Sequence, residues 1–192
     1  MIDQKLLLIS LLFVLNSTFA SGQCKLKIID KRVPFGMRTE TGRVIEAIII
    51  HSVFNKSGGD KYNVKQILKQ FRQYRVSSHY LIARNGKIFR LVKEKDVSFQ
   101  AGKSCLPDGQ TSVNQCSIGI ELVTTDDVSD KPTEKQIRSL TALVKDIQHR
   151  HAIKYVLRHS DIAPERKTDP WNMDWEEFQK KLSIGGLKIA SY

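Results

Sequence analysis

Short apolar runs alternate with amphipathic stretches along most of the chain, and their periods predict strands and helices. Residues 46–51 and 117–123 are apolar runs rich in isoleucine, which is typical of strands buried on both faces of a sheet. Residues 155–157 form a shorter run of the same kind. Residues 79–92 predict a hairpin, because Asn85-Gly86 can form a tight turn between two apolar segments.

Three amphipathic segments predict helices. Residues 62–71 carry apolar side chains at helical spacing. Residues 133–136 form a capping box, in which a threonine is followed three residues later by a glutamine, and they open a second helix. The apolar face of that helix consists of Ile137, Leu140, Val144 and Ile147. Asp174 is placed to cap a last helix that continues to Leu182. The order of these elements predicts an α/β fold with a single mixed central β-sheet flanked by helices.

The composition agrees with one folded domain. The chain has 192 residues, of which 41% are apolar and 27% charged, so disordered, collagen-like and coiled-coil proteins are excluded. Neither a repeat nor a break in composition divides it, and a single domain over residues 25–192 is expected. An apolar run of 18 residues, the minimum for a transmembrane helix, does not occur, so we expect no integral membrane segment.

The amino terminus differs from the rest. Lys5 precedes the apolar run 6–15, and small residues follow up to Ala20, which is the pattern of a secretory signal peptide over residues 1–20. Residues 18–20 suit cleavage after Ala20, and residues 20–22 suit cleavage after Gly22. A buried helix of the mature fold, or an uncleaved anchor, is the alternative. The leader predicts export, to the periplasm or out of the cell.

The charge adds an expectation about partners. Lysine and arginine number 31 against 20 acidic residues, which gives a net charge of +11 and favours anionic partners such as cell-wall polymers. The basic residues are scattered, without a basic run or interleaved aromatic residues, so nucleic-acid binding is not expected. A solvated basic surface with no specific role is the alternative.

Three cysteines become relevant once export is expected, because disulfides form in oxidising compartments. Cys105 and Cys116 flank the loop 106–110, which could close back on itself, and we predict a disulfide between them. Cys24 would then stay unpaired. Three free thiols are the alternative, since sequence alone does not establish connectivity.

Polar residues near the ends of the predicted strands are the candidates for chemistry. His51 ends the first strand, Glu121 interrupts the second, and His159 follows the third, with Asp169 ten residues later. If the strands are neighbours, these side chains meet at one sheet edge. Two histidines and one carboxylate make a common catalytic zinc site, and a second carboxylate could then transfer protons.

Each candidate also has an ordinary structural interpretation: a hydrogen-bonded histidine, a solvent-facing glutamate, or an aspartate in a turn. The spacing contains neither HExxH nor paired CxxC motifs, so spacing alone is a weak metal signal. His79, beside two serines at the start of a strand, is interpreted as a core residue rather than a ligand.

A family resemblance joins these segments. Five blocks occur in the same order as in the zinc-dependent N-acetylmuramoyl-L-alanine amidases of the type-2 family, which are relatives of peptidoglycan recognition proteins and phage amidase lysins. The blocks are residues 47–52, 76–86, 101–104, 114–122 and 158–170. Their joint occurrence is more specific than any single block. The resemblance implies the same α/β fold over residues 25–192.

The resemblance also implies roles. His51, His159 and Asp169 match the three ligands of Zn²⁺, Glu121 matches the acid/base carboxylate, and Lys167 matches the lysine that stabilises oxyanion charge. The family hydrolyses the amide between N-acetylmuramic acid and the L-alanine of the peptide stem. The implied protein is therefore a monomeric zinc amidase that acts on peptidoglycan or muropeptides.

One segment departs from the family pattern. Where the family often has an aromatic residue followed by His-Ala-Gly, residues 99–102 read Phe-Gln-Ala-Gly. Gln100 keeps hydrogen bonding but loses proton transfer, and we expect it to bind substrate together with Asn114. Two alternatives stay open: a recognition protein that binds peptidoglycan without cutting it, and a secreted lytic amidase directed at other cells.

Overall fold

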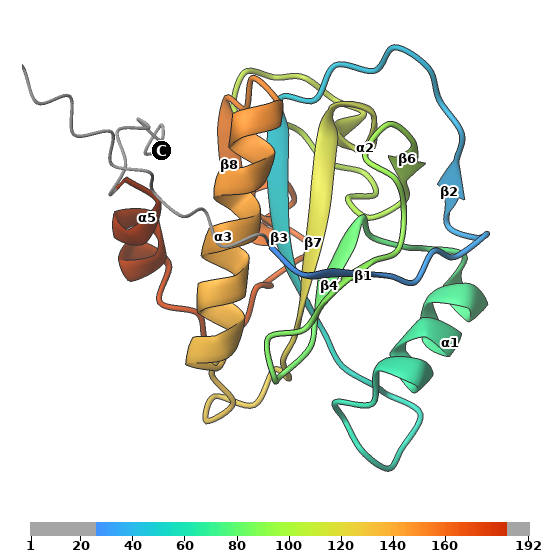
Figure 1. Ribbon diagram of the computed structural model, residues 1–192, viewed down its shortest axis with the longest axis vertical. Coiled ribbons are helices and arrows are strands. Elements are labelled where there is room, and N and C mark those ends of the chain that lie inside the picture. Colours follow the sequence, from blue (N-terminus) through green and yellow to red (C-terminus); the bar gives the residue numbers. More distant parts are fainter. Residues whose placement is uncertain (1–25, 184–192) are drawn as a thin grey trace, which may run out of the picture.

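A mixed sheet of six strands forms the centre of the protein in the computed structural model, which describes residues 26–183 (Figure 1). From one edge to the other the strands are β1 (Ile28–Asp30), β5 (Ile88–Arg90), β4 (Tyr80–Ile82), β7 (Ser117–Val123), β3 (Ala47–Val53) and β8 (Tyr155–Arg158). The four strands from β4 to β8 are parallel, and β5 is antiparallel to β4. The predicted mixed α/β sheet is confirmed.

The main helices begin where the sequence places caps. The side chain of Asn63 accepts a hydrogen bond from the backbone of Gln66 and so caps α1 (Val64–Tyr74). Thr133 and Gln136 form both bonds of the predicted capping box, which opens α3 (Glu134–Arg150). The last described helix is α5 (Trp175–Ser183).

Five short elements were not expected from the sequence. They are β1, β2 (Met37–Arg38), β6 (Val97–Ser98), α2 (Val113–Cys116) and α4 (His159–Ile162). Each has between two and four residues. A segment of this length is too short to show a period, so only its tertiary neighbours reveal it.

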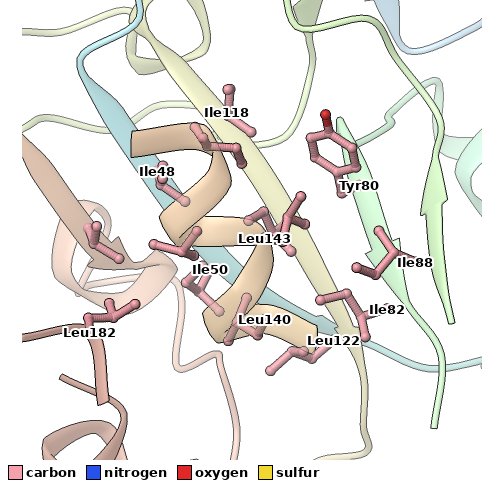
Figure 2. Close-up of a cluster of buried hydrophobic side chains, with 14 of the residues drawn as sticks. Ile48, Ile50, Tyr80, Ile82, Ile88, Ile118, Leu122, Leu140, Leu143 and Leu182 are labelled. Atoms are coloured by element: carbon pink, nitrogen blue, oxygen red, sulfur yellow. The ribbon is translucent and has the colours of Figure 1, made fainter. Parts of the chain in front are cut away.

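Helix α3 covers one face of the sheet, and Figure 2 shows the side chains that fill this layer. Leu140 and Leu143 of α3 lie among isoleucines such as Ile50 of β3 and Ile118 of β7. All four side chains are fully buried, and burial of each contributes about 1.5–3 kcal/mol to folding.

The opposite face carries two separate apolar clusters. One contains Ile49 of β3 with Val113 and Cys116 from α2, and the other contains Val53 of β3 with residues of α1. Because side chains alternate along a strand, His51 points to this same face, between Ile49 and Val53. The fold thus leaves a polar position between two apolar clusters at the carboxyl-terminal half of β3.

The predicted disulfide between Cys105 and Cys116 is wrong, since both residues are free thiols in the structure. Cys116 is buried under the sheet, whereas Cys105 is exposed on the loop. The loop closes through its backbone, because Cys105 pairs with Thr111 in a β-bridge and Leu106 N donates to Gln110 O over 2.9 Å. No covalent link is needed to shape it.

The predicted signal peptide and Cys24 lie outside the described residues. Among residues 26–183, none of the helices has the length and apolar character that crossing a membrane requires.

Candidate metal centre

Three side chains from separate parts of the chain converge at the carboxyl ends of β3 and β8. The Nδ1 atoms of His51 and His159 lie 2.9 Å apart, and Asp169 Oδ2 lies 3.5 Å from the first and 3.1 Å from the second. All three residues are at most 5% exposed. The three side chains predicted to form a metal site are therefore brought together.

The local fold explains this convergence. His51 is part of β3, and His159 begins α4 directly after β8, which is the parallel neighbour of β3. Asp169 reaches the same edge from a loop, where its Oδ2 accepts from the backbone N–H of Ser52 over 3.3 Å. Ser52 Oγ also accepts from the N–H of Trp171, which ties the loop to the end of β3.

The outer nitrogen of each histidine faces an oxygen that can only accept. His51 Nε2 contacts the side-chain oxygen of Gln100, and His159 Nε2 lies 3.3 Å from the carbonyl oxygen of Ala101. Each Nε2 can therefore donate its proton to that oxygen, and in this neutral tautomer the Nδ1 lone pair is free to bind a cation. Two lone pairs and a carboxylate oxygen face one another in a buried space, an arrangement that a cation between them would stabilise.

The geometry fits a tetrahedral metal ion. Zinc binds nitrogen and carboxylate oxygen at about 2.0–2.2 Å, so two ligand atoms of a tetrahedron are separated by about 3.4 Å. The three separations here, from 2.9 to 3.5 Å, lie around this value. Among the described residues, His51, His159 and Asp169 are the group of side chains that could hold a metal ion.

Electrostatics keep these groups in the forms that bind a cation. Burial lowers the pKa of His51 to about 4, so its imidazole is neutral at pH 7. Burial acts to raise the pKa of Asp169, but its close contacts with His159 and His51 outweigh it and hold the pKa below its ordinary value. Asp169 is therefore a carboxylate at pH 7.

Glu121 lies beside this cluster on the neighbouring strand. It is the register partner of His51 across the parallel pair β3–β7 and is 9% exposed. Its Oε2 is buried without a hydrogen-bond partner among the described residues. Burial, and then the charge of Asp169, raise the pKa of Glu121 to about 8, while Lys167 acts in the opposite direction. A buried carboxyl group with a perturbed pKa beside a candidate metal site is typical of a functional group.

An open groove of about 330 Å³ leads to the cluster. Lys167 lines it together with Glu121, His51 and His159. Its aromatic wall is formed by Phe54 and Trp171, whose rings meet edge to face with centroids 5.8 Å apart. The groove therefore combines an apolar wall, a lysine and the candidate metal ligands.

The two predicted substrate-binding residues occupy different positions. Gln100 lines the groove, but its side chain is held between His51 and Ser117. Asn114 Oδ1 accepts from the backbone N–H groups of Gln100 and Ala101 over 3.1 and 2.8 Å, so it fastens that loop. Substrate binding by either residue stays a prediction.

The sequence reasoning missed Ser117 and correctly left out His79. Ser117 opens β7, and no sequence signal relates it to a loop 17 residues earlier; only the packing does. His79 is fully buried and accepts from the N–H of Gly119 over 3.0 Å, and it is not part of the candidate metal site. His79 is therefore a residue of the buried core, as expected.

Comparisons with known proteins show which family this chain resembles. A family model described as N-acetylmuramoyl-L-alanine amidase matches residues 41–172. The N-acetylmuramoyl-L-alanine amidase AmiD of Escherichia coli K12 is 39% identical over 123 residues, which cover 55% of this chain and 44% of AmiD. The 1,6-anhydro-N-acetylmuramyl-L-alanine amidase AmpD of Citrobacter freundii is 38% identical over 117 residues, which cover 59% of this chain and 61% of AmpD.

A solved structure extends the comparison to three dimensions. The complex of AmiD from E. coli with the substrate anhydro-N-acetylmuramic acid-L-Ala-D-gamma-Glu-L-Lys matches with a TM-score of 0.61 and 31% identity. The match covers 75% of this chain and 60% of that chain. The chain thus spans between 44% and 61% of the length of the curated relatives described above.

Proposed function

Because this chain belongs to the N-acetylmuramoyl-L-alanine amidase family, we propose that it is a zinc-dependent amide hydrolase. Its substrate is the amide between N-acetylmuramic acid and L-alanine, in peptidoglycan or in muropeptides derived from it. The observation that carries the proposal is the convergence of His51, His159 and Asp169, with the unpaired carboxyl oxygen of Glu121 on the next strand. A protein that only held peptide stems would not require this proton-accepting group beside the metal ligands.

The residues divide the work of amide hydrolysis. Zinc held by the three ligands would polarise the amide carbonyl and lower the pKa of water. Glu121 accepts a proton from the attacking water at Oε2 and later delivers it to the leaving nitrogen of L-alanine. The pKa of Glu121 is about 8 without a metal; the positive charge of a bound divalent cation would lower it, toward the range in which the carboxylate accepts a proton at neutral pH.

Lys167 supplies a positive charge in the same groove. Negative charge develops on the carbonyl oxygen as the amide carbon becomes tetrahedral. A cation already in place stabilises that charge without reorganisation at the moment of reaction. Lys167 therefore favours the transition state over the bound amide.

The place of action is part of the proposal. The pattern of residues 1–20 supports export to the periplasm or out of the cell, and the net charge of +11 supports attraction to anionic wall polymers. The described residues of one chain include the three candidate metal ligands, Glu121 and Lys167, which supports a monomer as the acting unit.

The test is mass spectrometry of muropeptides and of intact sacculi after incubation with the protein, with zinc or with a chelator. We expect free stem peptides that begin with L-alanine, and their loss with chelator and in Glu121→Gln. The control is Glu134→Gln, an exposed glutamate whose side chain is 91% accessible, which should cleave like the wild type. A folded, zinc-loaded wild type that releases no stem peptide would leave a wall-binding protein instead of an enzyme.

A further inference from the structure

The side chain of Gln100 joins a continuous series of hydrogen bonds that ends at His51. Ser117 Oγ donates to the carbonyl oxygen of Val113 over 2.6 Å, and Gln100 Nε2 donates to Ser117 Oγ over 2.8 Å. The oxygen of the same amide contacts His51 Nε2. The series therefore runs from a backbone carbonyl, through two side chains, to a candidate metal ligand.

The direction of every bond in this series is determined. A carbonyl can only accept, so the hydroxyl hydrogen of Ser117 points to Val113 and its lone pairs remain for the NH₂ group of Gln100. That orients the amide with Oε1 toward His51. Because Oε1 can only accept, the proton of His51 lies on Nε2, and the Nδ1 lone pair points to His159 and Asp169.

Gly119 provides the space for this arrangement. A Cβ atom at Gly119 would lie 2.7 Å from Cγ and 2.9 Å from Cδ of Gln100, closer than real contacts allow. The glycine on β7 therefore leaves room for the side chain of Gln100 beside the strand. The backbone of residue 100 is held as well, since its N–H donates to Asn114 Oδ1 over 3.1 Å.

The Nε2 atoms of the two candidate histidine ligands face oxygen atoms of two consecutive residues. One oxygen belongs to a side chain and the other to the backbone. His159 faces the backbone carbonyl of Ala101, whose chemical nature no substitution alters. His51 depends on a side chain, and an inverted amide would present NH₂ in place of oxygen. Inversion would move the proton of His51 to Nδ1 and remove the lone pair that a metal needs.

We propose that Gln100, oriented by Ser117, is a positioning residue that holds His51 in its metal-binding tautomer. The inference rests on the proposed zinc amidase function and deepens it. It assigns Gln100 a role through His51 in addition to its place in the groove. Groups beyond the ligands that orient a metal-bound histidine alter metal affinity by about 10–100-fold when they are replaced.

The first test measures zinc affinity of the full chain by competition with a chromophoric chelator. Gln100→Met keeps the length of the side chain but lacks a strong acceptor, and we expect its zinc dissociation constant to rise about 10–100-fold. Gln100→Glu keeps an acceptor oxygen toward His51 but loses the donor to Ser117, so its zinc dissociation constant should rise less than that of Gln100→Met. Gln115→Met is the matched control, because Gln115 contacts Arg38 and Glu40 rather than the cluster.

The second test reads the proton of His51 directly. In zinc-free protein at pH 8, ¹⁵N spectra of the imidazoles should show His51 protonated on Nε2 in the wild type and in Gln100→Glu. Gln100→Met should lose this preference. Ser117→Ala removes only the partner that orients the amide. It should change the zinc dissociation constant and the His51 tautomer in the same direction as Gln100→Met, but by a smaller amount. This variant replaces Gln100→Met in both tests if Gln100→Met does not fold.

The outcomes separate this inference from the proposed function. Unchanged zinc affinity and an unchanged His51 tautomer in Gln100→Met would overturn the positioning role, even if the wild type cleaves muropeptides. If the wild type neither binds zinc nor cleaves, the proposed function fails. The tautomer of zinc-free His51 still decides whether Gln100 orients it.

Discussion

His51 on β3 and Glu121 on β7 are register partners on adjacent parallel strands, and both side chains leave the sheet on the face opposite to α3. The backbone ladder between these strands therefore sets the distance between a candidate metal ligand and the candidate proton acceptor. The other two candidate ligands, His159 and Asp169, come from the start of a helix and from a loop. Metal binding and proton transfer can thus be separated by substitution.

Zinc should stabilise the folded chain, because the three candidate ligands converge only in the native state. At a free zinc concentration about 1,000 times the dissociation constant, binding adds about 4 kcal/mol to the free energy of unfolding. Asp169→Asn should lose most of this gain, since the charged ligand is removed. Thermal unfolding of each variant, in zinc and in chelator, measures the gain in stability that zinc provides. Asp126→Asn, at an exposed position, is the control and should retain the full shift; an equal shift in Asp169→Asn would contradict the assigned ligand set.

Gly119→Ala should weaken both folding and zinc binding. The new methyl group meets the side chain of Gln100 at 2.7 Å, and overpacking of this kind costs about 1–3 kcal/mol. In a Gln100→Ala background the new methyl group at position 119 meets a shorter side chain, so Gly119→Ala should lower the free energy of unfolding by less. A double-mutant cycle by urea unfolding measures this coupling. Equal costs in the two backgrounds would show that the clash is relieved elsewhere.

Acid should destabilise the protein through Glu94. Burial acts to raise the pKa of Glu94, but hydrogen bonds from Arg150, Tyr80 and His151 outweigh it and lower the pKa to about 2. Its ordinary value is 4.5, so the carboxylate stabilises the fold above about pH 4.5 and loses this contribution as the pH falls to about 2. Glu94→Gln should therefore cost about 3 kcal/mol at pH 7 and progressively less towards pH 2.

Urea unfolding of Glu94→Gln and the wild type at several pH values between 3 and 7 checks this expectation. Glu134→Gln is again a suitable control, because its exposed pair with Arg138 contributes less than about 1 kcal/mol. A difference between Glu94→Gln and the wild type that stays constant over this pH range would show that the carboxylate charge is not the cause.

The two described cysteines should differ in reactivity. Cys105 is exposed, whereas Cys116 is 4% exposed, and burial raises the pKa of its thiol. A thiol reagent should therefore modify Cys105 in native protein and Cys116 only after unfolding. Peptide mass mapping measures both. A cross-linked peptide containing both Cys105 and Cys116 would contradict the free thiols of the structure.

Local patterns predicted the regular elements well. The runs at residues 46–51 and 117–123, the Asn85-Gly86 turn and the capping box at residues 133–136 each contain their signal within a few residues. The buried face of α3 was only partly predicted: Ile137 is half-buried, while Leu143 is fully buried. The disulfide prediction was wrong because loop proximity in sequence does not orient two side chains toward each other.

The sequence by itself determined which residue types were available at the strand ends, and with them the candidates His51, Glu121, His159 and Asp169. It also carried the family blocks, since those are linear patterns. Only the tertiary structure decided that β7, β3 and β8 are neighbours, that Asp169 returns to the end of β3, and that Gln100 lies against His51. These relations depend on strand register and on long-range packing, which bring together residues whose separation along the chain carries no local signal.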